Sequence, residues 1–203
     1  MKRESSYDER YAAEEYYWGA KPSAICQRVL QLLPPDRPLS LLDIGCGEGR
    51  NAVYFAYQGY RVTAFDLSAA GVAKAERLAE MAEVPITVLQ ADMNEHRLGQ
   101  NFDILFSTGV FHLIPRVQRE EIFGHYKQRT TPGGLNVFSI FVRKPFIGKA
   151  PDSDPGAEPW LSGELFTLYH DWKIEYCTEE IFDCMSGGIL HQHAISRMIA
   201  RKM

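Results

Sequence analysis

The fold of this chain is decided by the segment LSLLDIGCGEGRN, residues Leu39 to Asn51. Its apolar first half ends at Asp43, and glycines follow at positions 45, 47 and 49 before a helix-like run begins. This order predicts a buried parallel strand, a tight turn and the first turn of a helix. Glycine accepts positive φ and lets backbone N–H groups approach a ligand. Asp43 adds a carboxylate at the carboxyl end of the strand, where open α/β sheets bind their ligands.

Two kinds of ligand use a glycine-rich turn of this type. Dinucleotide sites have the pattern G-x-G-x-x-G and place a pyrophosphate on the helix N-terminus. Here the third glycine comes one position early, at Gly49, and Arg50 follows it. The leading carboxylate of Asp43 suits a ligand with an ammonium group better than a pyrophosphate. A glycine-rich loop with a purely structural use is the third interpretation.

A second acid strengthens the ligand interpretation. Residues 59–67 predict a turn and a second strand that ends at Asp66, 21 positions after Gly45. An acid about 20 residues further along a βαβ unit is where a ribose-binding carboxylate lies. Such a carboxylate accepts hydrogen bonds from both ribose hydroxyls, and these bonds are charge-assisted. The alternative role of Asp66 is a helix cap beside Ser68, and the two roles are compatible.

Composition bounds the class of protein. The chain has 203 residues with a formal net charge of −4, which predicts one soluble α/β domain and argues against a large nucleic-acid surface. The four cysteines form no C-x-x-C pair, so we expect neither a zinc site nor a disulfide framework. An apolar run of 18 residues is absent and the start, residues 1–5, is unlike a signal peptide. We therefore expect a cytoplasmic protein without a membrane partner.

Strands and helices alternate along the rest of the chain. Ser68 is a candidate N-cap, and Pro115 precedes a charged helix. We expect helices at 22–33, 51–58, 68–83, 115–129 and 161–170, partly helical chain at 178–185, and strands at 39–44, 59–67, 85–91, 101–107, 135–142, 172–177 and 191–201, with a turn at 131–134. This alternation predicts a mostly parallel seven-stranded sheet with helices on both faces, so that the ends of its first four strands share one edge and one pocket.

The last two strands indicate how the sheet ends. The short connection Ser186-Gly187-Gly188 predicts an antiparallel hairpin on the otherwise parallel sheet. A sheet of this kind with a reversed last strand is typical of S-adenosylmethionine (SAM) methyltransferases and not of the usual dinucleotide fold. This feature separates the two ligand interpretations better than the number of glycines does.

Several motifs together carry a resemblance to a known family. They are residues 42–51, Gly59-Tyr60, Asp66, Tyr16-Tyr17-Trp18, Leu190-His191 and residues 198–202. With them the chain resembles class I SAM methyltransferases, most closely the small tellurite-resistance (TehB-type) enzymes. The resemblance implies a Rossmann-like class I methyltransferase fold over one domain, residues 1–203. Gln192-His193 stands where we expect an arginine in that family, so the resemblance does not fix the acceptor.

The resemblance also implies where SAM binds. Gly45 and Gly47 line its methionine part, and Asp66 holds the ribose. The remaining residues of the implied site are Leu67 and Met93 against the adenine, Asp92 at the adenine amino group, Ser107 and Thr108 beside the sulfonium, Trp18 above it, and Asp43, Cys46 and Arg50 around the turn. No metal ligand is implied.

The sulfonium of SAM is already an activated methyl donor, so the protein mainly positions the reactants and excludes water. A base is needed only for an acceptor that enters protonated, and His112 or His191 is the predicted one. We expect a small acceptor such as a thiol, a chalcogen oxyanion or another metabolite, because the motifs of base N-methylation and pyrimidine C5-methylation are missing. The aromatic residues 1–20 and the loop 144–160 are the predicted arm or lid. A SAM-binding module without turnover and an NAD-dependent oxidoreductase are the alternatives; the chain is expected to be a monomer or a homodimer.

Overall fold

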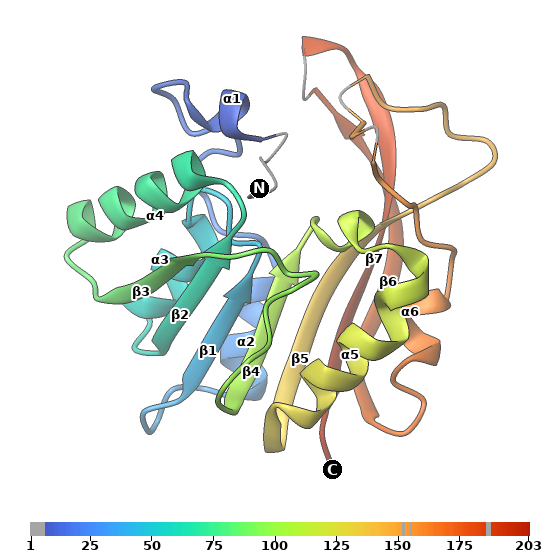
Figure 1. Ribbon diagram of the computed structural model, residues 1–203. Coiled ribbons are helices and arrows are strands. Elements are labelled where there is room, and N and C mark those ends of the chain that lie inside the picture. Colours follow the sequence, from blue (N-terminus) through green and yellow to red (C-terminus); the bar gives the residue numbers. More distant parts are fainter. Residues whose placement is uncertain (1–6, 152, 155, 186–187) are drawn as a thin grey trace.

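A computed structural model describes residues 7–151, 153, 154, 156–185 and 188–203. Its centre is one seven-stranded sheet with the order β3-β2-β1-β4-β5-β7-β6 (Figure 1). The pairs from β3 to β5 are parallel, whereas β7 is antiparallel to both β5 and β6. The predicted class I methyltransferase fold with one reversed strand is therefore confirmed.

The elements follow one another in the predicted alternation. The strands are β1 Ser40–Ile44, β2 Arg61–Asp66, β3 Ile86–Gln90, β4 Phe102–Thr108, β5 Thr130–Val142, β6 Lys173–Cys184 and β7 His191–Arg201. The helices are α1 Asp8–Tyr11, α2 Ile25–Leu32, α3 Arg50–Tyr57, α4 Ala69–Met81, α5 Arg119–Gln128 and α6 Glu164–Thr167, with short 3₁₀ turns η1 Phe111–Leu113 and η2 Arg116–Gln118. None of these described helices combines the length and the apolar character that crossing a membrane requires.

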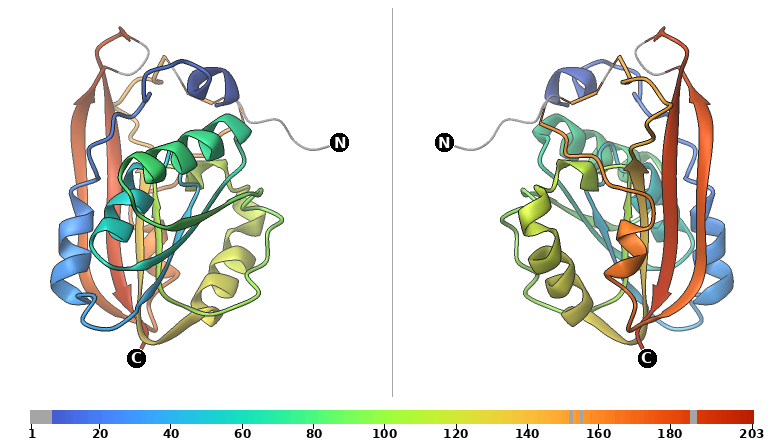
Figure 2. Two further views of the ribbon diagram at one scale, coloured as in Figure 1. Left: turned by 90° about the vertical axis from the view of Figure 1, so that its left-hand side faces the viewer. Right: turned by 90° about the vertical axis from the view of Figure 1, so that its right-hand side faces the viewer.

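Each face of the sheet has its own hydrophobic core. Residues of α2 and α3, such as Val29 and Phe55, pack on one face, whereas Phe123 of α5 and the buried Trp160 pack on the other. Figure 2 shows α2 and α5 on opposite sides of the sheet. Helices cover both faces of the sheet, so the central strands are buried on both sides and are apolar almost throughout. Ligands therefore have access at the ends of these strands.

Three sequence-based expectations were wrong in detail. Residues 178–185 were expected to be partly helical, but β6 continues to Cys184 and pairs with β7 along its length. The segment 131–134 was expected to be a turn, but it belongs to β5, where the pairing with β4 jumps from Phe102↔Thr130 to Ile104↔Leu135. The helix expected at 161–170 is limited to α6. Residues 186 and 187 of the predicted Gly-Gly connection, and residues 1–6 of the arm, lie outside the described residues.

Gly49 shows why the turn after β1 needs glycine. It is the N-cap of α3 with φ of 87°, a left-handed conformation that other residues rarely adopt. A Cβ atom at this position would lie 2.6 Å from the Cβ and 2.8 Å from the Cα of Ala75. Helix α4 thus packs directly on the backbone of the turn, and a side chain there would push the two apart.

We expect the substitution Gly49→Ala to lower the free energy of unfolding by several kcal/mol, measured by urea denaturation. The matched control is Gly133→Ala, because Gly133 also has positive φ (77°) but nothing lies within 4 Å of its Cβ position. The control carries only the cost of the left-handed conformation, about 1–2 kcal/mol. Equal losses in the two variants would contradict the role assigned to the contact with Ala75.

Candidate active site

A cavity of about 180 Å³ lies at the carboxyl ends of the first four strands. Seven of the twelve predicted cofactor residues line it: Trp18, Gly45, Asp66, Leu67, Asp92, Met93 and Thr108. They come from the arm, from the ends of β2 and β4, and from the segments that follow β1 and β3. The topology therefore gathers residues that are up to 90 positions apart into one site, as the parallel sheet predicts.

Asp66, at the end of β2, is the most constrained of these acids. Its Oδ2 accepts the Gly47 N–H at 2.8 Å and its Oδ1 accepts the Ser68 N–H at 2.9 Å. Burial raises the pKa of this carboxyl, and the two backbone donors oppose that shift. Ser68 caps α4, since its hydroxyl accepts the Gly71 N–H. Asp66 thus supports the entry to the helix and also faces the cavity, so its position is compatible with both predicted roles.

Asp43, near the end of β1, is buried beside this site. Burial raises the pKa of its carboxyl to about 7, the nearby Asp66 adds to the shift, and Arg50 opposes it. Its Oδ2 is buried and has no hydrogen-bond partner among the residues that the structure describes. A buried carboxylate oxygen without a donor is costly. A cationic group bound above the turn would supply the missing donor.

Five predicted cofactor residues do not line the cavity. Asp43 and Cys46 are buried beneath the turn. Ser107 is fully buried and donates to the carbonyl of Ile44 at 2.8 Å, so its hydroxyl joins β4 to β1. Arg50 turns outward and donates to the carbonyl of Trp18 at 2.8 Å. Gly47 is covered, because a Cβ atom there would lie 2.9 Å from the hydroxyl of Tyr11.

Aromatic side chains of the arm form one wall of the cavity. Tyr7 and Tyr11 line it together with Trp18, whose Nε1–H donates to the Tyr11 hydroxyl at 3.0 Å. Asp8 fixes α1 in place, since its carboxylate accepts from the Ser68 hydroxyl at 2.5 Å. The sequence predicted that the aromatic residues of the arm, with Tyr7 and Tyr11 among them, form a lid over the cofactor, but it assigned a place beside the sulfonium only to Trp18.

Glu48 holds the arm to the glycine-rich turn, and the sequence gave no sign of it. This buried residue accepts the N–H groups of Tyr17 at 3.2 Å and Trp18 at 3.3 Å. Lys74 of α4 pairs with the same carboxylate at 2.8 Å and also donates to the carbonyl of Glu15. The turn that shapes the cavity therefore also anchors the segment that covers it.

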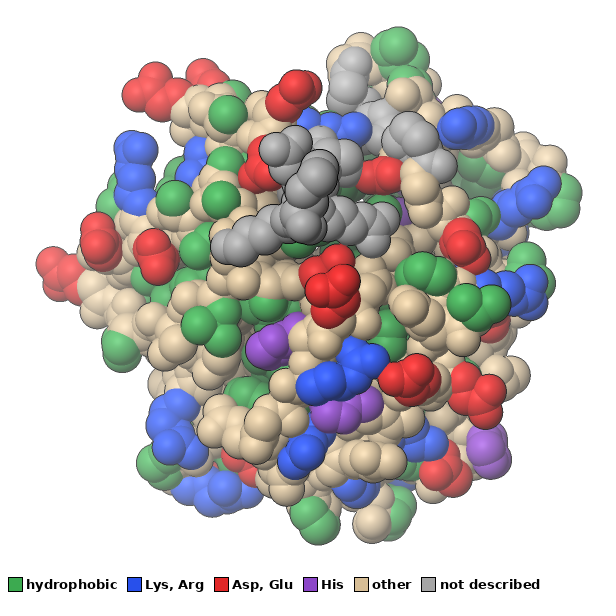
Figure 3. Space-filling model, in the orientation of Figure 1, with side chains coloured by type: hydrophobic (Ala, Val, Ile, Leu, Met, Phe, Trp, Pro, Cys, Tyr) green, Lys and Arg blue, Asp and Glu red, His purple; other side chains and the backbone are tan. Residues whose placement is uncertain are grey.

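The opposite wall is formed by the chain after β4 and by the loop before Trp160. Gly109, Val110 and Leu113 line the cavity there, and Asp154 reaches it from the loop. Figure 3 shows acidic, basic and hydrophobic side chains interspersed over the face of the molecule that is seen in Figure 1. Asn51 of α3 supports this wall from behind by donating to the hydroxyl of Thr108 at 3.3 Å.

Neither predicted histidine base lines the cavity. His112 lies in η1, and its Nδ1 is buried without a hydrogen-bond partner in the described part of the chain. Burial lowers the pKa of His112 to about 4. His191 begins β7, on the same face as His193, as its alternation in the sequence predicts. The structure thus separates both imidazoles from the residues around the glycine-rich turn.

Comparison with known proteins decides the family. The family described as "Tellurite resistance protein TehB" matches residues 6–191 of this chain. The chain belongs to the TehB family. Its resemblance to class I SAM methyltransferases is thereby confirmed, and it extends over both walls of the cavity.

Individual relatives agree with this family. The "Probable S-adenosyl-L-methionine-dependent methyltransferase TehB" of Haemophilus influenzae is 28% identical over 197 residues, which are 95% of this chain and 68% of that protein. A protein named hemagglutinin 1 from Eikenella corrodens is 31% identical over 76% of this chain and 48% of its own length. The crystal structure of TehB from Haemophilus influenzae superposes with a TM-score of 0.78 at 23% identity, over 97% of this chain and 66% of that one. The chain thus spans about half to two thirds of the length of these relatives.

We expect the variant Glu48→Gln to release the arm of this TehB-family protein. An amide in place of the carboxylate brings an N–H donor against the donors of Tyr17 and Trp18 and weakens a charge-assisted bond of about 1.5–3 kcal/mol. Amide hydrogen exchange at residues 17 and 18 should become at least roughly tenfold faster. Glu76→Gln, on the exposed side of α4, is the matched control. Unchanged exchange in Glu48→Gln would show that Glu48 does not anchor the arm.

Proposed function

We propose that this protein binds SAM in the cavity and transfers its methyl group to a small-molecule acceptor. The observation that carries the proposal is the buried pair of acids around the glycine-rich turn: Asp43, whose Oδ2 has no hydrogen-bond partner among the described residues, and Asp66 at the next strand end. The name of the Haemophilus influenzae relative agrees with this activity.

The donors and acceptors around the cavity fit the three parts of SAM. Asp43 lies buried beneath the turn, where its negative charge would attract the ammonium group of the methionine part. Asp66 faces the cavity, and a carboxylate can accept ribose hydroxyls while it keeps its backbone donors. Asp92 and Met93 line the far end together, where they suit the amino group and the ring of adenine. We assign Leu67 to the other side of that ring.

SAM supplies an electrophilic methyl group on a positively charged sulfur. The protein contributes mainly by positioning the reactants, because holding the methyl donor and the acceptor in line lowers the activation barrier of a bimolecular reaction by on the order of 7–11 kcal/mol. Thr108 and Gly109 at the end of β4 would border the sulfonium, and Trp18 would exclude water above it. The prediction that His112 or His191 acts as a base stays a prediction, since neither imidazole lines the cavity.

The arm acts as a lid in this proposal. The cavity is smaller than the roughly 300–1,000 Å³ of typical small-molecule sites, and the Tyr11 hydroxyl covers Gly47. Binding of SAM therefore requires the arm to move outward, while Glu48 keeps it attached at residues 17 and 18. Asp154 extends the same enclosure from the loop 144–160. A cytoplasmic location and a monomeric or homodimeric state complete the proposal.

We expect the protein to convert SAM to S-adenosylhomocysteine when small thiols, selenite or tellurite are supplied, measured by mass spectrometry. The variant Asp66→Ala should weaken SAM binding at least about 100-fold in calorimetry, because two charge-assisted hydrogen bonds are lost. Asp103→Asn is the control, since Asp103 binds Ser40 at the other end of the sheet. SAM binding without turnover across the acceptors would indicate a binding module, and NADH binding without SAM binding would indicate an oxidoreductase.

The pH dependence of SAM binding tests the role of Asp43. Because its pKa of about 7 lies above the ordinary value of 3.8, its carboxyl is protonated and uncharged below pH 7. The affinity for the ammonium group should therefore fall as the pH is lowered from 7.5 to 5.5, by up to about tenfold per unit. In Asp43→Asn the affinity at pH 7.5 should be low and this slope should be lost. A wild-type slope that persists in the variant would assign the titration to another group.

A further inference from the structure

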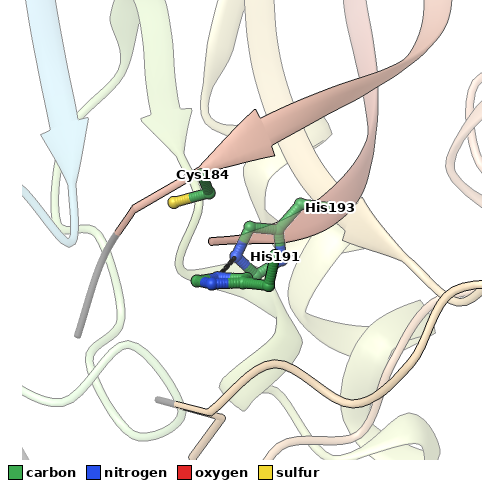
Figure 4. A group of neighbouring side chains, drawn as sticks. All are labelled: Cys184, His191 and His193. Atoms are coloured by element: carbon green, nitrogen blue, oxygen red, sulfur yellow. Dashed lines mark hydrogen bonds between the residues drawn. The ribbon is translucent and has the colours of Figure 1, made fainter. Parts of the chain in front are cut away.

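The tip of the β6–β7 hairpin gathers three side chains that sequence spacing kept apart. Cys184 is the register partner of His191 across the antiparallel pair, and His193 lies two residues further along β7. Side chains two residues apart on a strand share a face, so all three point to one side of the hairpin (Figure 4). From the sequence we expected no zinc site, because the four cysteines form no C-x-x-C pair. That expectation did not consider cysteines and histidines that pairing of strands brings together.

The distances within this group suit a single metal ion. One ligand atom from each residue lies within 4.8 Å of the other two, and the two Nε2 atoms are 3.0 Å apart. Tetrahedral zinc with bonds of about 2.0–2.1 Å to nitrogen and 2.3 Å to sulfur needs separations of about 3.3 Å between nitrogens and 3.6 Å to sulfur. The imidazoles are already near that spacing, and the thiol needs to approach by about 1 Å.

Neighbouring groups orient both imidazoles for this purpose. The Nδ1 atom of His191 is 2.6 Å from the carbonyl oxygen of Ile189, so Nδ1 carries the proton and the Nε2 lone pair faces His193. Metal-binding histidines usually donate their other N–H to a carbonyl or carboxylate in this way. The ring of His193 packs against Phe141 at 4.8 Å and Phe182 at 5.7 Å between ring centroids, which restricts its rotation.

We propose that Cys184, His191 and His193 bind one Zn²⁺ ion. A thiolate and two imidazoles form a donor set that zinc prefers, and Mg²⁺ or Ca²⁺ would select oxygen ligands instead. When the ion binds, the thiol proton of Cys184 leaves to solvent, and the one N–H proton of His193 moves from Nε2 to Nδ1, so that both Nε2 atoms present lone pairs to the metal. This inference does not depend on the proposed methyl transfer.

Among the described residues, the protein supplies three ligands, so the fourth position of a tetrahedral zinc would be taken by water or a further ligand, whereas closed four-ligand sites are structural. The site is joined to the cavity wall through Phe141, whose ring lies against His193 and His112 and approaches the Cβ position of Gly109 to 3.3 Å.

Metal titration of the full-length, chelator-treated protein tests this site. We expect one Zn²⁺ per chain in competition with a chromogenic chelator, and a thiolate-to-metal charge-transfer band when Co²⁺ replaces zinc. Cys184→Ser and His193→Gln should each weaken zinc binding at least about 100-fold, since loss of even an outer-shell partner costs 10–100-fold. Cys184→Ser should also remove the Co²⁺ band.

Matched controls come from the same region of the chain. Cys177 is an exposed cysteine on the same strand, and His170 is an exposed histidine just before it, so Cys177→Ser and His170→Asn should bind zinc like the wild type. Circular dichroism verifies that every variant is folded. Zinc affinities of Cys184→Ser and Cys177→Ser that do not differ, or a Co²⁺ complex without a thiolate band, would overturn the proposal. SAM binding by the same samples is measured separately, so failure of the metal site is distinct from failure of the methyltransferase assignment.

Discussion

The structure depends on the buried carboxylate of Asp66. It accepts one N–H from the turn after β1, at Gly47, and one from the entry to α4, at Ser68. Removing a carboxylate from water costs several kcal/mol unless donors replace the solvent, and these two bonds provide that replacement. A single side chain thus fixes how two consecutive βα units meet at the sheet edge, and the cavity lies at that junction.

The turn after β1 serves the cavity and the arm at the same time. Its backbone conformation allows α4 to pack on Gly49, while the side chain of Glu48 points away and binds the arm. Arg50 adds a further bond to the carbonyl of Trp18. Adjacent residues of the turn therefore hold the arm through three hydrogen bonds, from Tyr17 and Trp18 to Glu48 and from Arg50 to the Trp18 carbonyl.

Local patterns in the sequence predicted the first half of the sheet well, since an apolar strand, a glycine-rich turn and a capped helix are each determined by neighbouring residues. They predicted that Asp66, Asp92 and Thr108 share one edge. They did not predict the directions of side chains within the turn. Arg50 points outward because of the backbone conformation around it, and only the three-dimensional path of the chain fixes that direction.

The last part of the sheet was harder to predict from the sequence, for a different reason. Strand β6 lies at the edge of the sheet and most of its residues are half-buried or exposed, so the segment 178–185 lacks the strong alternation that identifies a strand. Its charged residues suited a helix equally well. The sequence placed Tyr7 and Tyr11 in the aromatic arm but could not fix which way they face, because a four-residue helix is too short to show a periodic pattern.

The register of the β6–β7 hairpin places Cys184, His191 and His193 on one face. A slip of one residue along β6 would move Cys184 to the opposite face from His191 and His193, since side chains alternate along a strand. The pair Asp183↔Gln192 opposes such a slip, because the Gln192 amide donates to the Asp183 carboxylate at 3.0 Å on the other face of the hairpin. Gln192-His193 stands where the family resemblance predicts an arginine, so the departure from the family pattern lies in the same segment of β7 that carries His191 and His193.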